Sequence, residues 1–481
     1  MWAGTDDGNV QLTKDGGKTW VNFRGKIPGM PVGAWVPQIR ASRYHAAEAF
    51  VVCNDYRRGD FKPYIFRTKN FGQTWELMVS ESKVKGYALC MIQDPVEPNL
   101  IFAGTEQGLW VSFDNGAAFE QWKNGYPSVS TYDFAIQERE ADLCIATFGR
   151  ALYVMDDIRP LRKFAAGGGK TTTKKLTVFE SPVAWQAQVK HKAGYDYSTW
   201  GLYDGQNRSR GAAYSFYVKP PEKADTSKSK SDSVSVRIYN GQNELVRSLK
   251  VKADTGFNRN YWGFETRGIR QPGSLKPKPN TPEPPTGMPA FPGTYKIVLS
   301  MGKDVDSTML IVKSDPALNV VKEIYDAKQA AIKRLEKNVD KIVEATDRLT
   351  DADETIAKID AQLKNVEGAA ADSLRKSGKS MTDSIKKVRN FIMGTPQEKQ
   401  GYGTPYEITV SERLREARSE IMRKNKIPDA QEFGLIEMAE SLLNAALQKA
   451  NNFFSGPWKK YQQQAEATPM KFLESSNHWS K

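Results

Sequence analysis

The chain has 481 residues and a formal net charge of +13 at neutral pH, with 39% hydrophobic and 26% charged residues. Domains usually hold about 100–200 residues, so this length predicts two to four of them, and the composition excludes a wholly disordered chain. No apolar run approaches the ~18 residues that a membrane-spanning helix needs. Three widely spaced cysteines and three histidines fit neither a disulfide scaffold nor a His-rich metal site. We therefore expect no metal, no cofactor and no transmembrane segment.

The positive charge belongs to the middle of the chain. Residues 158–316 contain 26 Lys and Arg against 13 Asp and Glu, whereas residues 1–157 contain 16 against 19. The basic stretches at 170–175 and 219–230 are interleaved with Ser, Thr and Pro, not with aromatic residues that could stack on bases. Such stretches are typical of solvated loops, so we expect no nucleic-acid partner.

An eight-residue pattern recurs in the first 157 residues. Residues 13–20 (TKDGGKTW) return as residues 68–75 (TKNFGQTW) and, in degraded form, as residues 112–119 (SFDNGAAF). Short strands that repeat at intervals of about 40–50 residues are typical of four-stranded β-propeller blades. The repeat therefore predicts part of a β-propeller.

The residue types of the repeat predict a tight turn. The Asp or Asn side chain can accept bonds from amides of its own turn, and the Gly can adopt a positive φ. We therefore expect Asp15, Asn70 and Asp114 to be structural and not catalytic. Trp20 and Trp75 are expected to pack between blades.

The octet resembles the Asp-box, or BNR, repeat of sortilin-type receptors and xyloglucanase-type glycoside hydrolases. Residues 94–112 are similar to a blade opening, and residues 142–157 to the last blade, of large secreted bacterial proteins labelled as BNR-repeat glycosyl hydrolases. That family commonly has His-Gly-Arg in its last blade, and Phe148 takes the place of the His, which argues against proton chemistry there. The resemblance covers nearly the whole chain and implies a secreted, periplasmic or cell-surface bacterial protein.

The number of blades is small for a closed ring. Three box patterns and one closing set of strands make three to four blades, whereas the rings of that family usually have more. A propeller must close to hide its sheet edges. We therefore interpret residues 1–157 as the C-terminal blades of a longer propeller, with any signal peptide outside this chain. The N-terminal remainder of that propeller, or a partner subunit, is expected to cover the first blade near Trp2 and Val10.

Two further domains are predicted after a linker at residues 158–183. Residues 184–315 contain short alternating strands, turn signals and a proline-rich insertion, a pattern typical of an Ig- or fibronectin-like β-sandwich. From residue 316 to 481 the apolar period becomes that of helices, which predicts a helical bundle. The fold class is therefore multidomain β + α: a partial Asp-box β-propeller, a β-sandwich and a C-terminal bundle.

Candidate binding residues fall in aromatic and arginine-rich segments, and no catalytic residue is predicted. They are Tyr56, Arg57, Arg58 and Asp60 in a loop of the second blade, Arg150 in the last blade, and Tyr195, Tyr197 and Trp200 before the sandwich. The loop either binds a ligand or is a surface loop held by its own Asp–Arg pairs. The aromatic cluster either binds sugar or joins the propeller to the sandwich. The sequence contains no nucleophile elbow, P-loop or dinucleotide fingerprint.

Three functional classes are compatible with these patterns. We favour a non-enzymatic interaction or scaffold protein that docks through propeller, sandwich and bundle surfaces, because the recognisable motifs are structural. The resemblance also implies two alternatives: a glycoside hydrolase or carbohydrate-binding protein, and a sortilin-like receptor that sorts peptides or proteins. Fold likeness alone does not decide between them.

Overall fold

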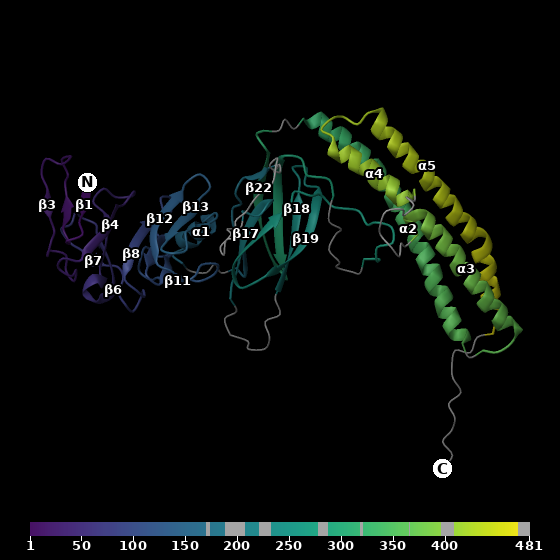
Figure 1. The fold of residues 1–481 in the computed structure, drawn as a ribbon, viewed down its shortest axis with the longest axis horizontal. Helices are drawn as coiled ribbons and strands as arrows, with labels where there is room; N and C mark the ends of the chain where they lie inside the picture. Colours follow the sequence, from purple (N-terminus) through teal and green to yellow (C-terminus); the bar gives the residue numbers. More distant parts are fainter. Residues whose placement is uncertain are drawn as a thin grey trace, which may run out of the picture.

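The computed structural model describes residues 1–169, 174–187, 207–220, 232–277, 287–317, 321–364, 366–395 and 408–469. The N-terminal part is built of sheets and the C-terminal part of helices. Figure 1 shows the parts following one another along the long axis: four small sheets, two further sheets, then the helices. The predicted residues Tyr195, Tyr197 and Trp200 lie outside the described residues.

Four small antiparallel sheets form the first 157 residues. The first holds β1 (Trp2–Gly4), β2 (Val10–Leu12) and β3 (Val21–Asn22), and the second holds β4 (Trp35–Ala41), β5 (Ala49–Asp55), β6 (Asp60–Thr68) and β7 (Glu76–Leu77). The third holds β8 (Ala88–Gln93), β9 (Ile101–Thr105), β10 (Gly108–Ser112) and β11 (Glu120–Trp122), and the fourth holds β12 (Thr131–Gln137), β13 (Asp142–Thr147) and β14 (Leu152–Met155). Within each sheet, neighbouring strands follow sequence order.

The repeated octets form the turns before the last strand of the first three sheets, and we call them the box turns. In the first, Asp15 Oδ1 accepts bonds from the Thr13 hydroxyl (2.8 Å) and the Thr19 amide (2.9 Å), while the Gly17 amide donates to Thr13 Oγ1 (2.8 Å). The second and third turns repeat these bonds around Asn70 and Asp114. Each turn therefore satisfies its own polar groups.

The sheets are joined through apolar seams. The first seam buries Val10, Leu12 and Phe23 against Val36, Val51 and Phe66, and the second buries Phe50, Ile65 and Met78 against Met91, Ala103 and Trp110. Phe102, Leu109, Phe134 and Leu143 belong to the cluster between the third and fourth sheets. Burial of apolar surface along these seams holds the four sheets together.

The structure corrects two expectations about the first sheet. Trp75 packs in the first seam, with its ring centroid 5.9 Å from that of Trp2 and 5.8 Å from that of Phe23. Trp20, its counterpart, was expected to pack likewise but is 44% exposed, because no described sheet lies against its side of the first sheet. Trp2 and Val10 were expected at an outer contact. The side chains of both instead pack toward the second sheet, with Val10 fully buried, while the Trp2 backbone lies in the edge strand β1.

The predicted linker contains helix α1 (Arg159–Ala166) and strand β15 (Leu176–Val178). Two sheets follow: β15, β17 (Ala212–Val218) and β20 (Gly256–Trp262) in one, and β16 (Ala184–Gln186), β22 (Asp304–Ser314), β21 (Gly293–Met301), β18 (Asp232–Tyr239) and β19 (Leu245–Ala253) in the other. Both contribute to one buried cluster, which includes Phe216 and Trp262 from the first and Val236 and Ile297 from the second. The Ig-like assignment stays a prediction.

A clamp fastens the fourth small sheet to these two sheets. Arg259 of β20 donates to the carbonyl oxygens of Asp156 and Asp157 and to Ser215 Oγ (3.1 Å). Beside it, the Phe164 ring of α1 packs edge-on against Phe257 of β20, with 5.4 Å between centroids. Hydrogen bonds and apolar packing therefore both hold this joint.

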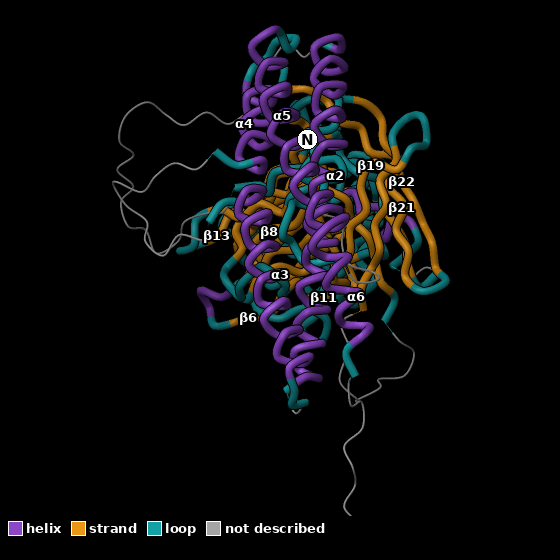
Figure 2. Tube along the Cα trace, turned by 90° about the vertical axis from the view of Figure 1, so that its right-hand side faces the viewer, coloured by secondary structure: helices purple, strands orange, loops and turns teal. Residues whose placement is uncertain are grey.

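The C-terminal region consists of helices packed along their lengths. They are α2 (Lys322–Leu363), α3 (Ala369–Met393), α4 (Val410–Arg423), α5 (Ala430–Phe453), the π-helical turn η2 (Phe454–Trp458) and α6 (Lys459–Ala467). Figure 2 shows α2, α3, α4 and α5 side by side. Their apolar faces share one core, and Asp429 with Glu432 caps α5. Among the helices of the described residues, none is long and apolar enough to cross a membrane.

Candidate functional site

The predicted loop of the second sheet divides into two kinds of residue. Arg58 Nε donates to Asp55 Oδ1 (2.7 Å), and its Nη2 donates to the Val32 carbonyl (2.7 Å). Asp60 accepts bonds from the Tyr64 hydroxyl (2.7 Å) and the Lys62 amide (3.1 Å). Arg58 and Asp60 therefore fasten the loop, which was the alternative interpretation of this segment.

Tyr56 and Arg57 belong instead to a set of aromatic contacts. The 3₁₀ helix η1 (Tyr56–Arg58) places the Tyr56 ring on that of Tyr87, with 4.6 Å between centroids and 16° between planes. Phe61 is 57% exposed and lies 6.2 Å from Tyr87. The Arg57 guanidinium lies 4.8 Å from the Trp35 ring, a cation–π distance.

The fourth sheet adds a second aromatic pair. Tyr132 is 43% exposed, Phe148 is 72% exposed, and their centroids are 5.8 Å apart. The pKa of Tyr87 is raised, first by its burial and then by nearby Glu106, Tyr132 and Tyr56. Hydrogen bonds link the segments that carry the two pairs: the Glu106 amide donates to the Tyr87 carbonyl, the Ser130 hydroxyl to the Glu106 carbonyl (3.3 Å), and the Phe148 amide to the Ser130 carbonyl. Arg150, the predicted residue of the last sheet, follows Phe148 by two positions in the same turn and is exposed.

We call this set the aromatic face: Trp35, Tyr56, Arg57, Phe61, Tyr87, Tyr132 and Phe148. Its members come to one end of the sheets because of the order and direction of the strands. Trp35, Tyr87 and Tyr132 lie at the N-terminal ends of β4, β8 and β12, the first strands of three successive sheets, which pack side by side. Tyr56 and Phe148 lie in the turns that follow the second strands. Adjacent strands are antiparallel, so those turns come to the same end of the sheets.

Sequence reasoning found Tyr56, Arg57 and Arg150 but missed the ring residues at the strand starts. Trp35, Tyr87 and Tyr132 stand more than 40 positions from one another, and no motif surrounds any of them. One signal was present: after each box turn, an aromatic residue stands at or next to the start of the first strand of the next sheet. A repeat analysis extended beyond the octet would have detected this regularity.

Three carboxylates near the aromatic face, those of Asp55, Asp60 and Asp133, accept bonds from neighbouring groups. Asp133 Oδ1 accepts bonds from Arg40 Nη2 and Gln38 Nε2, both at 3.1 Å. Burial tends to raise the pKa of Asp60, but the bonds from Tyr64 and the Lys62 amide outweigh it and hold the pKa below its ordinary value. A carboxyl group that must donate a proton needs a raised pKa. These groups therefore suit ligand binding better than proton transfer.

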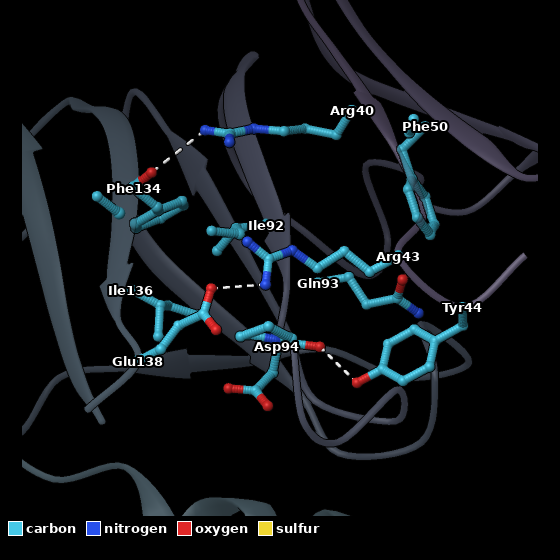
Figure 3. Close-up of a pocket in the computed structure, with 13 residues that line it drawn as sticks. Arg40, Arg43, Tyr44, Phe50, Ile92, Gln93, Asp94, Phe134, Ile136 and Glu138 are labelled. Atoms are coloured by element: carbon cyan, nitrogen blue, oxygen red, sulfur yellow. Dashed lines mark hydrogen bonds and ion pairs between the residues drawn. The ribbon is translucent and has the colours of Figure 1, made fainter. Parts of the chain in front are cut away.

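A pocket of about 280 Å³ lies at the opposite ends of β4, β8 and β12 (Figure 3). Its lining includes Arg40, Arg43, Tyr44 and Glu138. Arg43 Nη1 lies 2.6 Å from Glu138 Oε1, and the Tyr44 hydroxyl donates to the Asp94 carbonyl (2.8 Å). Burial, and then the charge of Asp94, raise the pKa of Tyr44 to about 12. Its polar groups are paired with one another, so this pocket ties three sheets together and presents no poised base.

A larger cleft of about 750 Å³ separates the fourth sheet from the two sheets that follow. Trp185 of β16 is 43% exposed on its wall, and Arg208 Nη2 bridges Asp142 Oδ1 (2.7 Å) and Asp156 Oδ1 (3.1 Å). Burial raises the pKa of Asp157, although Arg159 and Arg259 oppose this. Across the described ranges, no group of three His, Cys, Asp or Glu residues could hold a metal ion.

Comparison with known proteins gives weak likenesses to solved structures. No protein-family model and no curated protein matches the chain. A GH74 enzyme from Niastella koreensis is 11% identical at a TM-score of 0.28, covering 64% of this chain and 51% of that one. The GH74 xyloglucanase from Xanthomonas campestris is 12% identical at 0.27, covering 64% and 43%. The chain thus spans about half or less of the solved chains it resembles, and these scores carry no argument about function.

Proposed function

We propose that this chain is a non-enzymatic binding protein whose aromatic face holds an extended, neutral carbohydrate chain. The observation that carries the proposal is the gathering of two ring groups at one end of adjacent sheets: Phe61, Tyr56 and Tyr87 in one, and Tyr132 with Phe148 in the other. Sugar rings present flat C–H surfaces that exclude water when they pack on an aromatic ring. Rings from three sheets would contact successive sugar units.

The polar groups around the rings complete this chemistry. Arg57 and Gln107 are exposed at the same end of the sheets and can donate N–H groups to sugar hydroxyls. The four-sheet region has a small net negative charge, because residues 1–157 hold 16 Lys and Arg against 19 Asp and Glu. That balance favours a neutral chain over an acidic one. A protein would encounter a polysaccharide of this kind outside the cytoplasm. This agrees with the secreted, periplasmic or cell-surface location that the family resemblance implies.

Three carboxylates near the aromatic face favour binding without hydrolysis. Glycoside hydrolysis uses two carboxyl groups on either side of the bond, one of them a proton donor with a raised pKa. Near the aromatic face, Asp55, Asp60 and Asp133 each accept a bond from an arginine, a tyrosine or an amide. The proposed role is therefore recognition without hydrolysis, which is the carbohydrate-binding alternative of the sequence analysis and not the scaffold function favoured there.

The test is native affinity electrophoresis of the full chain in gels containing xyloglucan, mixed-linkage β-glucan or galactomannan, with carboxymethylcellulose as the charged comparison. We expect at least one neutral polymer to retard the protein. Replacing both Tyr132→Ala and Phe148→Ala should weaken binding at least about tenfold, since exposed anchor rings dominate such contacts. Trp185→Ala is the matched control, because Trp185 is as exposed as Tyr132 but lies on β16.

Three outcomes would contradict the proposal. Unretarded migration in every neutral gel would show that the aromatic face does not bind such polymers. An equal loss in the Trp185→Ala control would show that the effect is not local to the face. Release of reducing sugar ends from a bound polymer would show that the chain is an enzyme, in line with the glycoside hydrolase alternative.

A further inference from the structure

The seams between the small sheets share one construction. In the first seam Phe23, three residues after the box aromatic Trp20, lies against Gly72 of the next box turn. A Cβ on Gly72 would stand 2.4 Å from the Phe23 ring. In the second seam Met78, three residues after Trp75, lies against Gly116, and a Cβ there would stand 2.2 Å from Met78 Cε. Each glycine therefore leaves the space that a large apolar side chain from the preceding sheet occupies, and we call this space the seat.

The box aromatics are covered in the same way. Trp75 packs on Phe23, and Phe119 is 9% exposed in the cluster that contains Met78. The box turns of the second and third sheets thus each receive the preceding sheet at two points. The glycine accepts its apolar residue, and the aromatic side chain packs beside it.

The first box turn has both features, but nothing described covers them. A Cβ on Gly17 would meet only Met1 Cε (3.9 Å) and Trp20 Nε1 (4.0 Å), both from its own sheet. Around it Met1 is 67%, Trp20 44% and Val21 52% exposed. A glycine with φ +99° and an aromatic residue are present at a seat that is empty in the described structure.

The strand order of the first sheet gives an independent observation. The box turn lies between β2 and β3, so β1 is the counterpart of β5 and β9, and no described strand corresponds to β4 or β8. Met1 and Thr13 exchange both backbone bonds and the Thr5 amide donates to Asn9, which directs the N–H and C=O groups of Trp2 and Gly4 to the open edge. An open edge of this kind is ready to pair with another strand.

We infer that the outer face of the first sheet is the docking surface for a further sheet of the same box type. Its box aromatic is followed three positions later by a large apolar residue, which packs on Gly17 and Trp20. In the same segment, about ten residues further on, comes a strand that pairs with β1. This spacing follows from the seams, because ten positions separate Met78 from the start of β8 and twelve separate Phe23 from the start of β4.

One residue of the outer face of the first sheet restricts which sheets can dock there. Gln11 stands two residues before its box turn, where the second and third sheets have Phe66 and Trp110 buried in their seams. A docked sheet must offer a hydrogen-bonding group opposite this amide, since an unpaired buried amide is costly. The docking sheet therefore differs from the second and third sheets at the position that meets Gln11.

The test places a photoreactive benzophenone amino acid at position 20 of the full chain, in the cells that produce it, and identifies the crosslinked peptide by mass spectrometry. We expect a peptide with a box pattern and a bulky apolar residue three positions after the box aromatic. Its sequence also shows whether the sheet belongs to the same polypeptide or to another. The same amino acid at position 185, where Trp185 is similarly exposed, is the control.

Crosslinks only to peptides without that pattern, or no yield above the position 185 control, would overturn the inference. Hydrogen exchange provides a second measurement that needs no variant. In the captured assembly, the Trp2 and Gly4 amides should exchange at least about tenfold more slowly than in the isolated chain. Unchanged exchange at these amides would equally overturn it. Neither measurement involves the aromatic face, so carbohydrate binding can fail while this inference stands.

Discussion

The box turns and the aromatic face are built on the same sheets but treat their side chains in opposite ways. In the box turns, Asp15, Asn70 and Asp114 are polar residues whose bonds are satisfied within their own turn. On the aromatic face, Tyr132 and Phe148 are apolar residues left in solvent at 43% and 72% exposure. The conspicuous polar residues of the repeat thus bond within their own turns, whereas the inconspicuous aromatic residues form the candidate site.

The largest expected effect lies in a seam. Gly72→Ala should destabilise the four-sheet region by about 3 kcal/mol, because its Cβ would overlap the Phe23 ring and because alanine is strained at φ +84°. Urea unfolding followed by tryptophan fluorescence measures this. Gly17→Ala is the matched control, and it should cost only about 1 kcal/mol for its φ. Equal losses would show that the seams do not depend on the seated side chain.

The aromatic face should show the reverse pattern, with binding changed and stability kept. Phe148→Ala should weaken carbohydrate binding about tenfold while the free energy of unfolding changes by less than about 0.5 kcal/mol. The physical reason is that a ring 72% exposed contributes little to the core. Isothermal titration with an oligosaccharide, paired with urea unfolding, measures both. A stability loss without a binding loss would assign Phe148 to the fold.

The box turns should respond in stability alone. Asp114→Ala removes the acceptor of the Ser112 hydroxyl (2.8 Å) and the Ala118 amide (2.9 Å), at a cost of about 1 kcal/mol. Asp114→Asn should be nearly neutral, because Asn70 performs the same role with an amide oxygen. Thermal unfolding and affinity electrophoresis of both variants measure this. Reduced binding with unchanged melting would overturn the structural role.

The smallest effect is a pH dependence at the clamp. Burial raises the pKa of Asp157 above its ordinary 3.8, so the folded protein keeps this proton at a pH where the unfolded chain has lost it. The contribution of Asp157 to stability therefore falls as pH rises through that window. Asp157→Asn should remove this dependence, since Asn tolerates φ +47° and does not titrate. Urea unfolding between pH 4 and 7 measures the difference, and a wild-type stability that rises relative to the variant would contradict the sign.

The sequence predicted what depends on near neighbours and missed what depends on distant ones. The box turns were predictable because Thr13, Asp15 and Thr19 lie within seven residues and bond to one another. The exposure of Trp20 was not, because burial of a box aromatic depends on the preceding sheet. The aromatic face shows the same limit, because Trp35, Tyr87 and Tyr132 come to one end of the sheets only when β4, β8 and β12 pack together.

The middle and C-terminal regions follow the same rule. Alternating residues predicted the strands β18 and β19, whereas the parallel pairing of β16 with β22 joins segments more than 100 residues apart. Helix α1 was assigned to a linker, although Pro160 at its first turn is a usual start signal. The change to a helical apolar period from residue 316 onward needed no distant information, and α2 contributes the buried Ile342 and Leu349 to the shared core of the helices.

The length of helix α2 sets the distance between the two ends of the helical region. Its 42 residues form one uninterrupted helix, which at 1.5 Å per residue is about 60 Å long. A flexible tether of the same number of residues would have a fluctuating end-to-end distance of about 35 Å. The helix therefore acts as a rigid spacer and not as a flexible tether. The two ends of α2 are held at a fixed separation that a flexible tether would not keep.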